Sequence, residues 1–214
     1  MSAITITFGD CAENNIGMQR LGTIADSGFT YQELVDAKLR FESKDPNVEC
    51  EIVDLTASQP AHVLIVRNGI NILLENNDDE GQEPNYEAGQ GRIVAFRDVP
   101  YTAIAREAIS NFFGPRAREL LAEGNYYYDP NKCGIGFHGD GERRKVIALR
   151  LGTSIPLHFQ WFYRGLPQGS RIIINLNHGD LYAMSDKAVG HDWRKTTIYT
   201  LRHAAGAEKY LLIK

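Results

Sequence analysis

The sequence predicts an α+β protein in which N-terminal helices and strands pack on a double-stranded β-helix (jelly-roll) core. From residue 125 onward, eight short runs have the length and alternation of strands, with turn residues and no helical period between them. Before residue 125, apolar residues recur with helical spacing in several stretches. With 214 residues, 43% of them hydrophobic, the chain can bury one sizeable core. We expect an N-terminal α/β extension over residues 1–100 and the jelly-roll core over residues 101–214.

Local signals place the elements of the N-terminal part. Thr30-Tyr31-Gln32-Glu33 has the form of a capping box, which opens a helix. Asn68-Gly69 between two apolar runs predicts a β-hairpin. Pro115, after the break at Gly114, suits the first turn of a helix that would end at Gly124. The remaining expectations are strands at 3–8, 48–55, 62–67, 70–74 and 92–96, a helix at 102–113, and a long acidic loop at 75–90.

The expected strands of the C-terminal part follow from alternation of apolar and polar residues. The clearest case is residues 157–163, where Leu157, Phe159 and Trp161 alternate with polar or aromatic neighbours. The eight runs are 125–128, 134–138, 145–151, 157–163, 171–176, 180–184, 197–202 and 209–213.

Composition limits the classes of function. A net charge of −4 gives no overall attraction to nucleic acid or to an anionic membrane. The three cysteines are widely spaced and form no CxxC motif, which argues against a disulfide framework or a zinc knuckle. The N-terminus lacks the pattern of a signal peptide, and no apolar run approaches the ~18 residues of a membrane span. We expect an intracellular protein, cytoplasmic or nuclear, that is monomeric and makes no membrane contact.

His138 and Asp140 carry the first chemical signal. They stand two positions apart at the end of the expected strand 134–138, where an imidazole and a carboxylate can reach one metal ion. Together with one distant histidine and open positions, this is the ligand set of non-haem Fe(II) oxygenases. His191 is the expected third ligand and His203 competes with it. His178 is less suited, because His-Gly-Asp is typical of a turn.

Arg202 follows His191 by eleven residues, on an expected strand. The forked guanidinium of arginine can make two parallel hydrogen bonds to a carboxylate. It therefore suits the distal carboxylate of 2-oxoglutarate, whose other end chelates iron. The alternative is an arginine exposed on a surface strand.

Residues 126–206 resemble the AlkB family of Fe(II)/2-oxoglutarate dioxygenases. The resemblance lies in Tyr128 followed by a turn and Ile-Gly-Phe-His-Gly-Asp, in the following strand Val-Ile-Ala-Leu-Arg-Leu-Gly, and in His-Gly-Asp-Leu-Tyr-Ala-Met-Ser at 178–185. It implies iron at His138, Asp140 and His191, and 2-oxoglutarate held by Tyr128 and Arg202. Tyr126 stands where the family commonly has an Asn and is a further candidate for binding the co-substrate. The family's second arginine is absent after Arg202.

The resemblance implies a dioxygenase that uses Fe(II), 2-oxoglutarate and O2 to hydroxylate a C–H bond. The implied substrate is an alkylated base in DNA or RNA, which would be demethylated oxidatively, as in nucleic-acid repair. The resemblance also implies that residues 1–100 serve substrate recognition, as the N-terminal region does in this family. Such a substrate needs a basic rim and stacking surfaces. The candidates for the rim are Lys132, Arg143, Arg144 and Lys145, and those for stacking are Tyr86, Phe96, Tyr101 and Trp161. The alternatives are a protein side chain or small molecule as the substrate, or a jelly-roll binding module without enzymatic activity.

Overall fold

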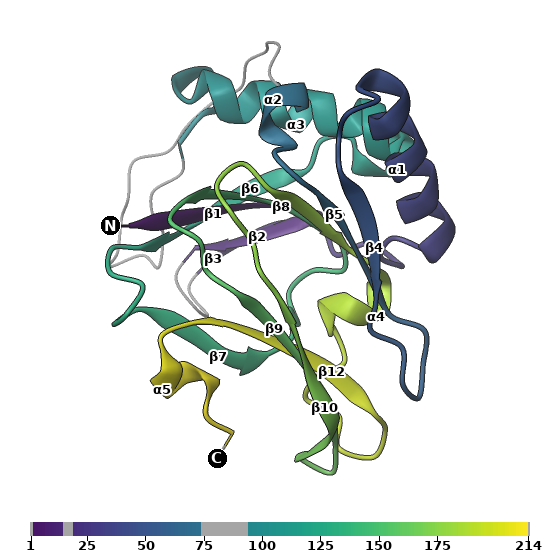
Figure 1. Ribbon diagram of the computed structural model, residues 1–214, viewed down its shortest axis with the longest axis vertical. Helices are drawn as coiled ribbons and strands as arrows, with labels where there is room; N and C mark the ends of the chain where they lie inside the picture. The colour runs from purple at the N-terminus through teal and green to yellow at the C-terminus, as the bar shows by residue number, and fades with distance from the viewer. Residues whose placement is uncertain (1, 15–18, 74–93, 214) are drawn as a thin grey trace.

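A computed structural model describes residues 2–14, 19–73 and 94–213, and these residues form three layers (Figure 1). Helices α1 (Tyr31–Lys44) and α3 (Pro100–Phe113) lie over one face of a six-stranded sheet, with the short helix α2 (Ile70–Leu73) beside them. A four-stranded sheet faces the other side of the large sheet. The molecule is therefore α+β with mostly antiparallel strands, as the sequence predicts.

The large sheet combines strands from both halves of the chain, and every neighbouring pair is antiparallel. β1 lies inside it, between β8 and β6. The boundary expected near residue 100 therefore runs through this sheet, with β1, β4 and β5 before it and the other strands after it. The order is β4 (Cys50–Asp54), β5 (His62–Val66), β11 (Leu181–Met184), β8 (Val146–Gly152), β1 (Ala3–Gly9) and β6 (Leu121–Tyr127).

The small sheet has the order β10 (Leu166–Ile174), β9 (Leu157–Tyr163), β12 (Thr200–Gly206) and β7 (Gly134–His138). The alternating residues Leu157, Phe159 and Trp161 of β9 point toward the large sheet and join the core between the two sheets. The indole Nε1 of Trp161 donates to the carbonyl oxygen of Leu55 at 2.7 Å. The alternation in the sequence thus places the core face of β9 correctly.

The helical layer has its own core against the outer face of the large sheet. The capping box at the start of α1 is confirmed. The Glu33 amide donates to Thr30 Oγ1 at 3.2 Å, and the Glu33 carboxylate accepts from the Thr30 amide at 2.8 Å. Phe41 of α1 stacks on Phe112 of α3 with 3.9 Å between ring centroids. Within the described residues, no helix is both long and apolar enough to span a membrane.

Several local predictions are wrong. The run after Asn68-Gly69 forms α2 and not a second hairpin strand, because both edges of β5 are already paired, with β4 and β11. The expected helix after Pro115 is only the 3-10 turn η3 (Pro115–Ala117), and the chain then enters β6. The last expected strand is the short helix α5 (Glu208–Leu211), which packs beside β7 and β12.

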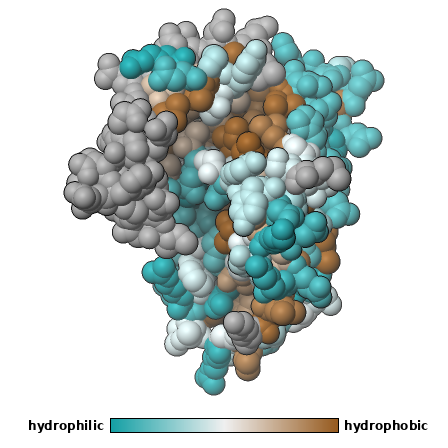
Figure 2. Space-filling model, turned by 90° about the vertical axis from the view of Figure 1, so that its left-hand side faces the viewer, coloured by the Kyte–Doolittle hydropathy of each residue, from teal (hydrophilic) through white to brown (hydrophobic). Residues whose placement is uncertain are grey.

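The other elements flank these layers. β2 (Cys11–Asn14) and β3 (Gln19–Gly22) form a hairpin that contacts β6, and α4 (Asp186–Val189) follows β11. A 3-10 turn, η2 (Phe96–Asp98), starts at the end of the expected strand 92–96, of which residues 92 and 93 lie outside the described residues. The expected loop at 75–90 also lies outside them. Figure 2 views the side on which β6 and β7 lie and shows exposed hydrophobic surface in its upper half.

Candidate metal centre and anion pocket

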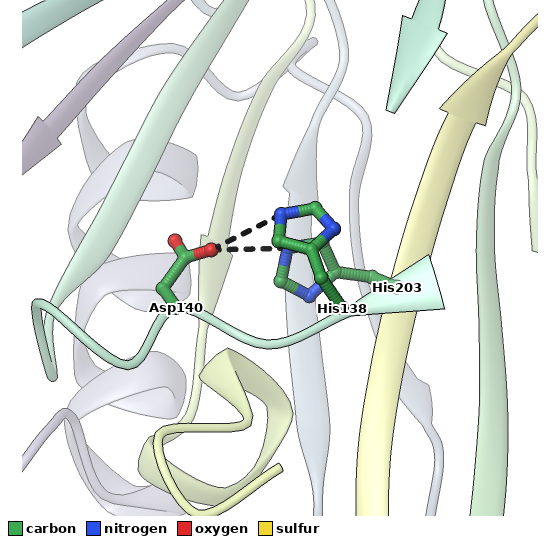
Figure 3. A group of neighbouring side chains, drawn as sticks. All are labelled: His138, Asp140 and His203. Carbon is green, nitrogen blue, oxygen red and sulfur yellow. Dashed lines mark ion pairs between the residues drawn. The ribbon is translucent and has the colours of Figure 1, made fainter. Parts of the chain in front are cut away.

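Three side chains converge between the two sheets (Figure 3). His138 is the last residue of β7, Asp140 follows it in the next loop, and His203 lies on β12 directly opposite His138 in the ladder. Nε2 of His138 is 3.5 Å from Oδ1 of Asp140, and Nε2 of His203 is 3.4 Å from the same oxygen. The potential ligand atoms all lie within 4.8 Å of one another.

The loop that carries Asp140 is fixed by a close backbone approach. A Cβ on Gly139 would lie 2.1 Å from the carbonyl oxygen of Gly190, so only glycine allows the two segments to pack this closely. The Asp140 amide donates to the carbonyl oxygen of Val189 at 3.0 Å. The middle residue of His-Gly-Asp is therefore required by packing, and this packing turns Asp140 toward the histidines.

The surroundings hold Asp140 as a carboxylate. Burial alone would raise its pKa, but the imidazoles of His138 and His203 and the charge of Arg143 outweigh burial and hold the pKa well below its ordinary value. Burial lowers the pKa of His203, and the charge of His138 lowers it further against the opposing effect of Asp140. The pKa of His138 is raised, because Asp140 and the Gly136 carbonyl outweigh the effect of burial.

The three residues fit a divalent metal ion. Ligand atoms about 2.1 Å from a metal lie roughly 3.0–3.4 Å apart at octahedral or tetrahedral angles, close to the 3.4 and 3.5 Å found here. Nδ1 of His138 donates to the Gly136 carbonyl at 2.8 Å, which leaves Nε2 free to bind a metal. Nδ1 of His203 is buried and has no such partner among the described residues. Two imidazoles and one carboxylate suit iron more than a hard cation such as magnesium.

A cavity of about 600 Å³ contains this triad. Its wall includes inward-facing residues of β1, β6 and β8 in the large sheet and of β7 and β12 in the small one. Glu13, Glu123 and Glu142 contribute carboxylates to the same wall. The triad is therefore part of an open site and not a closed structural centre.

Arg150 lines the same cavity and is only 1% exposed. Its Nε and Nη1 have no hydrogen-bond partner among the described residues. Thr5 lies opposite Arg150 in the β1–β8 ladder, and its buried Oγ1 is also unpaired within the part of the chain that the structure describes. The ring of Tyr127 lies 5.8 Å from the guanidinium carbon, and the buried Tyr182 lines the cavity too. Buried donors without an acceptor indicate an anion-binding pocket.

His191, the expected third ligand, does not belong to the metal group. Its Nδ1 lies 3.1 Å from the carbonyl oxygen of Arg143 and donates to it. His203 takes the third position, as the competing possibility in the sequence had it. His178 lies in the expected turn, where its Nδ1 accepts from the Gly152 amide at 3.0 Å.

Arg202 faces away from the cavity, because neighbouring residues of a strand point to opposite faces and His203 points inward. Its guanidinium carbon lies 4.2 Å from the ring centroid of Phe162 and 5.4 Å from that of Trp193. Tyr126 and Tyr128 are 63% and 64% exposed, whereas Tyr127 between them lines the cavity. The structure thus does not bring the three residues expected to hold 2-oxoglutarate into the cavity.

The sequence signal for Arg150 was a single arginine inside the apolar run Val-Ile-Ala-Leu-Arg-Leu.

The residues expected to form a basic rim have other partners. Arg143 is buried among carboxylates, and Arg144 pairs with Asp186 at 2.5 Å. Lys145 donates to the Arg116 carbonyl, and Lys132 pairs with Asp129.

The expected stacking residues do not contribute to the cavity wall within the described part of the chain. Trp161 belongs to the core between the sheets, and Phe96 lies under the guanidinium of Arg106. Tyr101 is exposed on α3. Tyr86 lies outside the described residues.

Fold and site together define an α+β protein of two facing antiparallel sheets with a candidate metal centre between them. The chain is 40% identical over 249 residues to the "Uncharacterized protein R156" of Acanthamoeba polyphaga mimivirus, and the match covers 97% of each chain. The chain therefore belongs to the same family as this viral protein. No family model matches the sequence, and no solved structure matches it.

Proposed function

We propose that this protein is an Fe(II)- and 2-oxoglutarate-dependent dioxygenase. One observation carries the proposal: a His-Asp-His group and a buried arginine, whose Nε and Nη1 have no hydrogen-bond partner among the described residues, line the same cavity. The first fits a metal ion with open positions, and the second fits a carboxylate. An enzyme that binds iron and a dicarboxylate together needs both features in one site.

The path of the chain supports a double-stranded β-helix for the core. β7 lies in the small sheet, β8 in the large sheet, β9 and β10 in the small sheet, β11 in the large sheet and β12 in the small sheet. Repeated crossing between two facing antiparallel sheets is how a jelly roll is wound. β1 completes the large sheet from the N-terminal end of the chain. His138 and His203 then come from neighbouring strands of the small sheet.

We assign Nε2 of His138, Oδ1 of Asp140 and Nε2 of His203 as the groups that would hold the iron. Bound there, Fe(II) supplies the redox chemistry and the activation of O2. The overall reaction would convert R–H, O2 and 2-oxoglutarate into R–OH, succinate and CO2. The protein residues bind and orient the reactants and limit access of water to the cavity.

Arg150 takes the role that the sequence resemblance gave to Arg202. Its guanidinium would donate two hydrogen bonds to the distal carboxylate of 2-oxoglutarate, and Thr5 and Tyr182 line the same cavity. Burial raises the pKa of Tyr182 to about 12, so its hydroxyl stays protonated and can donate at neutral pH.

For the substrate, we propose a protein side chain or a small molecule in preference to a nucleic-acid base. A nucleic-acid backbone needs several free cations beside the site. Arg143, Arg144 and Lys145 are engaged inside the protein, and the cavity wall carries Glu13, Glu123 and Glu142. An oxidative demethylase acting on alkylated DNA or RNA stays the alternative.

The test is 2-oxoglutarate turnover to succinate with Fe(II) and O2, followed by a panel of methylated peptides, amines, single-stranded DNA and RNA. We expect uncoupled turnover without substrate and stimulation by a peptide or an amine. His138→Ala should abolish both. A wild-type protein that binds neither Fe(II) nor 2-oxoglutarate would end the proposal. A protein that binds both and never forms succinate would instead be a binding module.

A further inference from the structure

Arg143 is not among the residues proposed to hold iron or 2-oxoglutarate, yet it is buried beside the metal group. It is 3% exposed and lines the cavity. Its side chain contacts three carboxylates: Glu123 at 2.5 Å, Glu142 at 3.0 Å and Asp140 at 3.7 Å. One buried cation therefore serves three carboxylates, one of which is the candidate metal ligand Asp140.

The position of Arg143 is fixed from several directions. Glu123 reaches it from β6, and Glu142 is its neighbour in the chain. Nδ1 of His191 donates to its backbone carbonyl at 3.1 Å. A Cβ on Gly9 would lie 3.1 Å from Cδ of Arg143, so the glycine at the end of β1 leaves room for the arginine stem. Because both the backbone and the side chain of Arg143 are held in place, its guanidinium can fix the orientation of the Asp140 carboxylate.

The two oxygens of Asp140 have different neighbours. Oδ1 faces Nε2 of both His138 and His203, at 3.5 and 3.4 Å. Oδ2 faces Nε of Arg143 at 3.7 Å, an ion pair without a hydrogen bond, because the single Nε–H is donated to Oε1 of Glu142 at 3.2 Å. A carboxylate whose second oxygen faces a fixed cation is oriented to present its first oxygen to a metal ion.

We infer that Arg143 is a positioning residue that holds Oδ2 of Asp140 and so makes Asp140 a ligand through Oδ1 alone. The inference rests on the proposed function, because it presumes a metal between His138, Asp140 and His203. Its consequence is that one more coordination position stays open for a co-substrate. His191, which the sequence suggested as a ligand, contributes indirectly by holding the backbone of Arg143.

The test compares binding of Mn(II) to the full chain with Arg143→Gln, with Arg143→Lys and with Arg144→Gln as the matched control. Arg144 is the next residue, but its guanidinium pairs with Asp186 and not with Asp140. We expect the Mn(II) dissociation constant to rise about 10- to 100-fold in Arg143→Gln. Arg143→Lys should lie between wild type and Arg143→Gln, because lysine keeps the charge but not the fork. Arg144→Gln should bind as wild type does.

The visible absorption spectrum of bound Co(II) gives a second readout, since it reports the coordination of the metal. We expect it to change in both Arg143 variants, when Asp140 can bind through two oxygens, and to stay unchanged in Arg144→Gln. Wild-type affinity and spectrum in the Arg143 variants would overturn the inference while leaving the proposed metal site intact. If Arg143→Gln does not fold, Arg143→Lys decides in the same way. Failure of the wild-type protein to bind any Mn(II) or Co(II) would overturn both.

Discussion

Replacement of Arg150 by methionine should make the ligand-free protein more stable and at the same time weaken binding of 2-oxoglutarate. Methionine has a similar length and is apolar, so it can fill the space of the arginine stem. In the wild type, Nε and Nη1 of this 1%-exposed residue are buried without partners among the described residues. Loss of this desolvated charge should raise the free energy of unfolding by about 1–4 kcal/mol, as replacement of buried ionic groups by apolar residues does.

Whereas Arg150→Met should stabilise the folded protein, it should weaken the binding of 2-oxoglutarate. Loss of one partner from a buried, charge-assisted pair costs about 2–5 kcal/mol of binding free energy. At 1.4 kcal/mol per factor of ten, the dissociation constant of 2-oxoglutarate should rise by about 30-fold to several thousand-fold. If Arg150 had a purely structural role, its replacement would lower the stability of the protein and leave the affinity for 2-oxoglutarate unchanged. A gain in stability together with a loss of affinity therefore distinguishes a binding role from a structural one.

The assay is urea denaturation of the Mn(II)-loaded protein with and without 2-oxoglutarate. At a ligand concentration of about one hundred times the wild-type dissociation constant, the wild type should gain about 2.7 kcal/mol, and Arg150→Met should gain less than about 1 kcal/mol. Arg202→Met is the matched control and should keep the full gain, because Arg202 stacks on Phe162 outside the cavity. The reasoning is refuted if Arg150→Met keeps the gain, or if only Arg202→Met loses it.

Three further outcomes test other parts of the structure. His203→Ala should abolish Mn(II) binding in isothermal titration, whereas His191→Ala should weaken it by a few-fold at most; equal losses would contradict the assignment of the third ligand. The pKa of Tyr182 is about 12 in the folded protein and 10 in its ordinary state, so its contribution to stability is complete below pH 10 and is lost as pH rises toward 12. The loss should reach about 2.7 kcal/mol, and Tyr182→Phe should not show it in urea denaturation at pH 8 and 11.5. Thr30→Ala removes the N-cap of α1 and should lower the free energy of unfolding by about 1 kcal/mol; an unchanged urea midpoint would show that the capping box adds nothing.

The sequence predicts an element correctly where the residues of that element alone determine its structure. The capping box at Thr30 fixed the start of α1, and the alternation around Phe159 fixed the inward face of β9. His138 and Asp140 were found for the same reason. Their spacing, with Gly139 between them, is a property of a short segment, and the end of a strand turns both side chains to one place.

Tertiary contacts decided the elements that local residues leave open. The run at 70–74 is apolar enough for a strand, but β5 has no free edge for it. β1 lies at the start of the chain, and its place between β6 and β8 depends on pairing across more than a hundred residues. Such pairing has no signature in the sequence of a single chain.

For the site, the sequence alone predicts a chemical type: two imidazoles and a carboxylate for a metal, and an arginine for an anion. Which residues of these types come together depends on the tertiary structure. His203 and Arg202 are adjacent in the chain, and only the pairing of β12 with β7 shows that His203 faces inward and Arg202 outward. Likewise, only the pairing of β8 with β1 buries Arg150 so that its Nε and Nη1 find no hydrogen-bond partner in the part of the chain that the structure describes. Which side of a strand becomes the interior depends on its neighbours, and these come from distant parts of the chain.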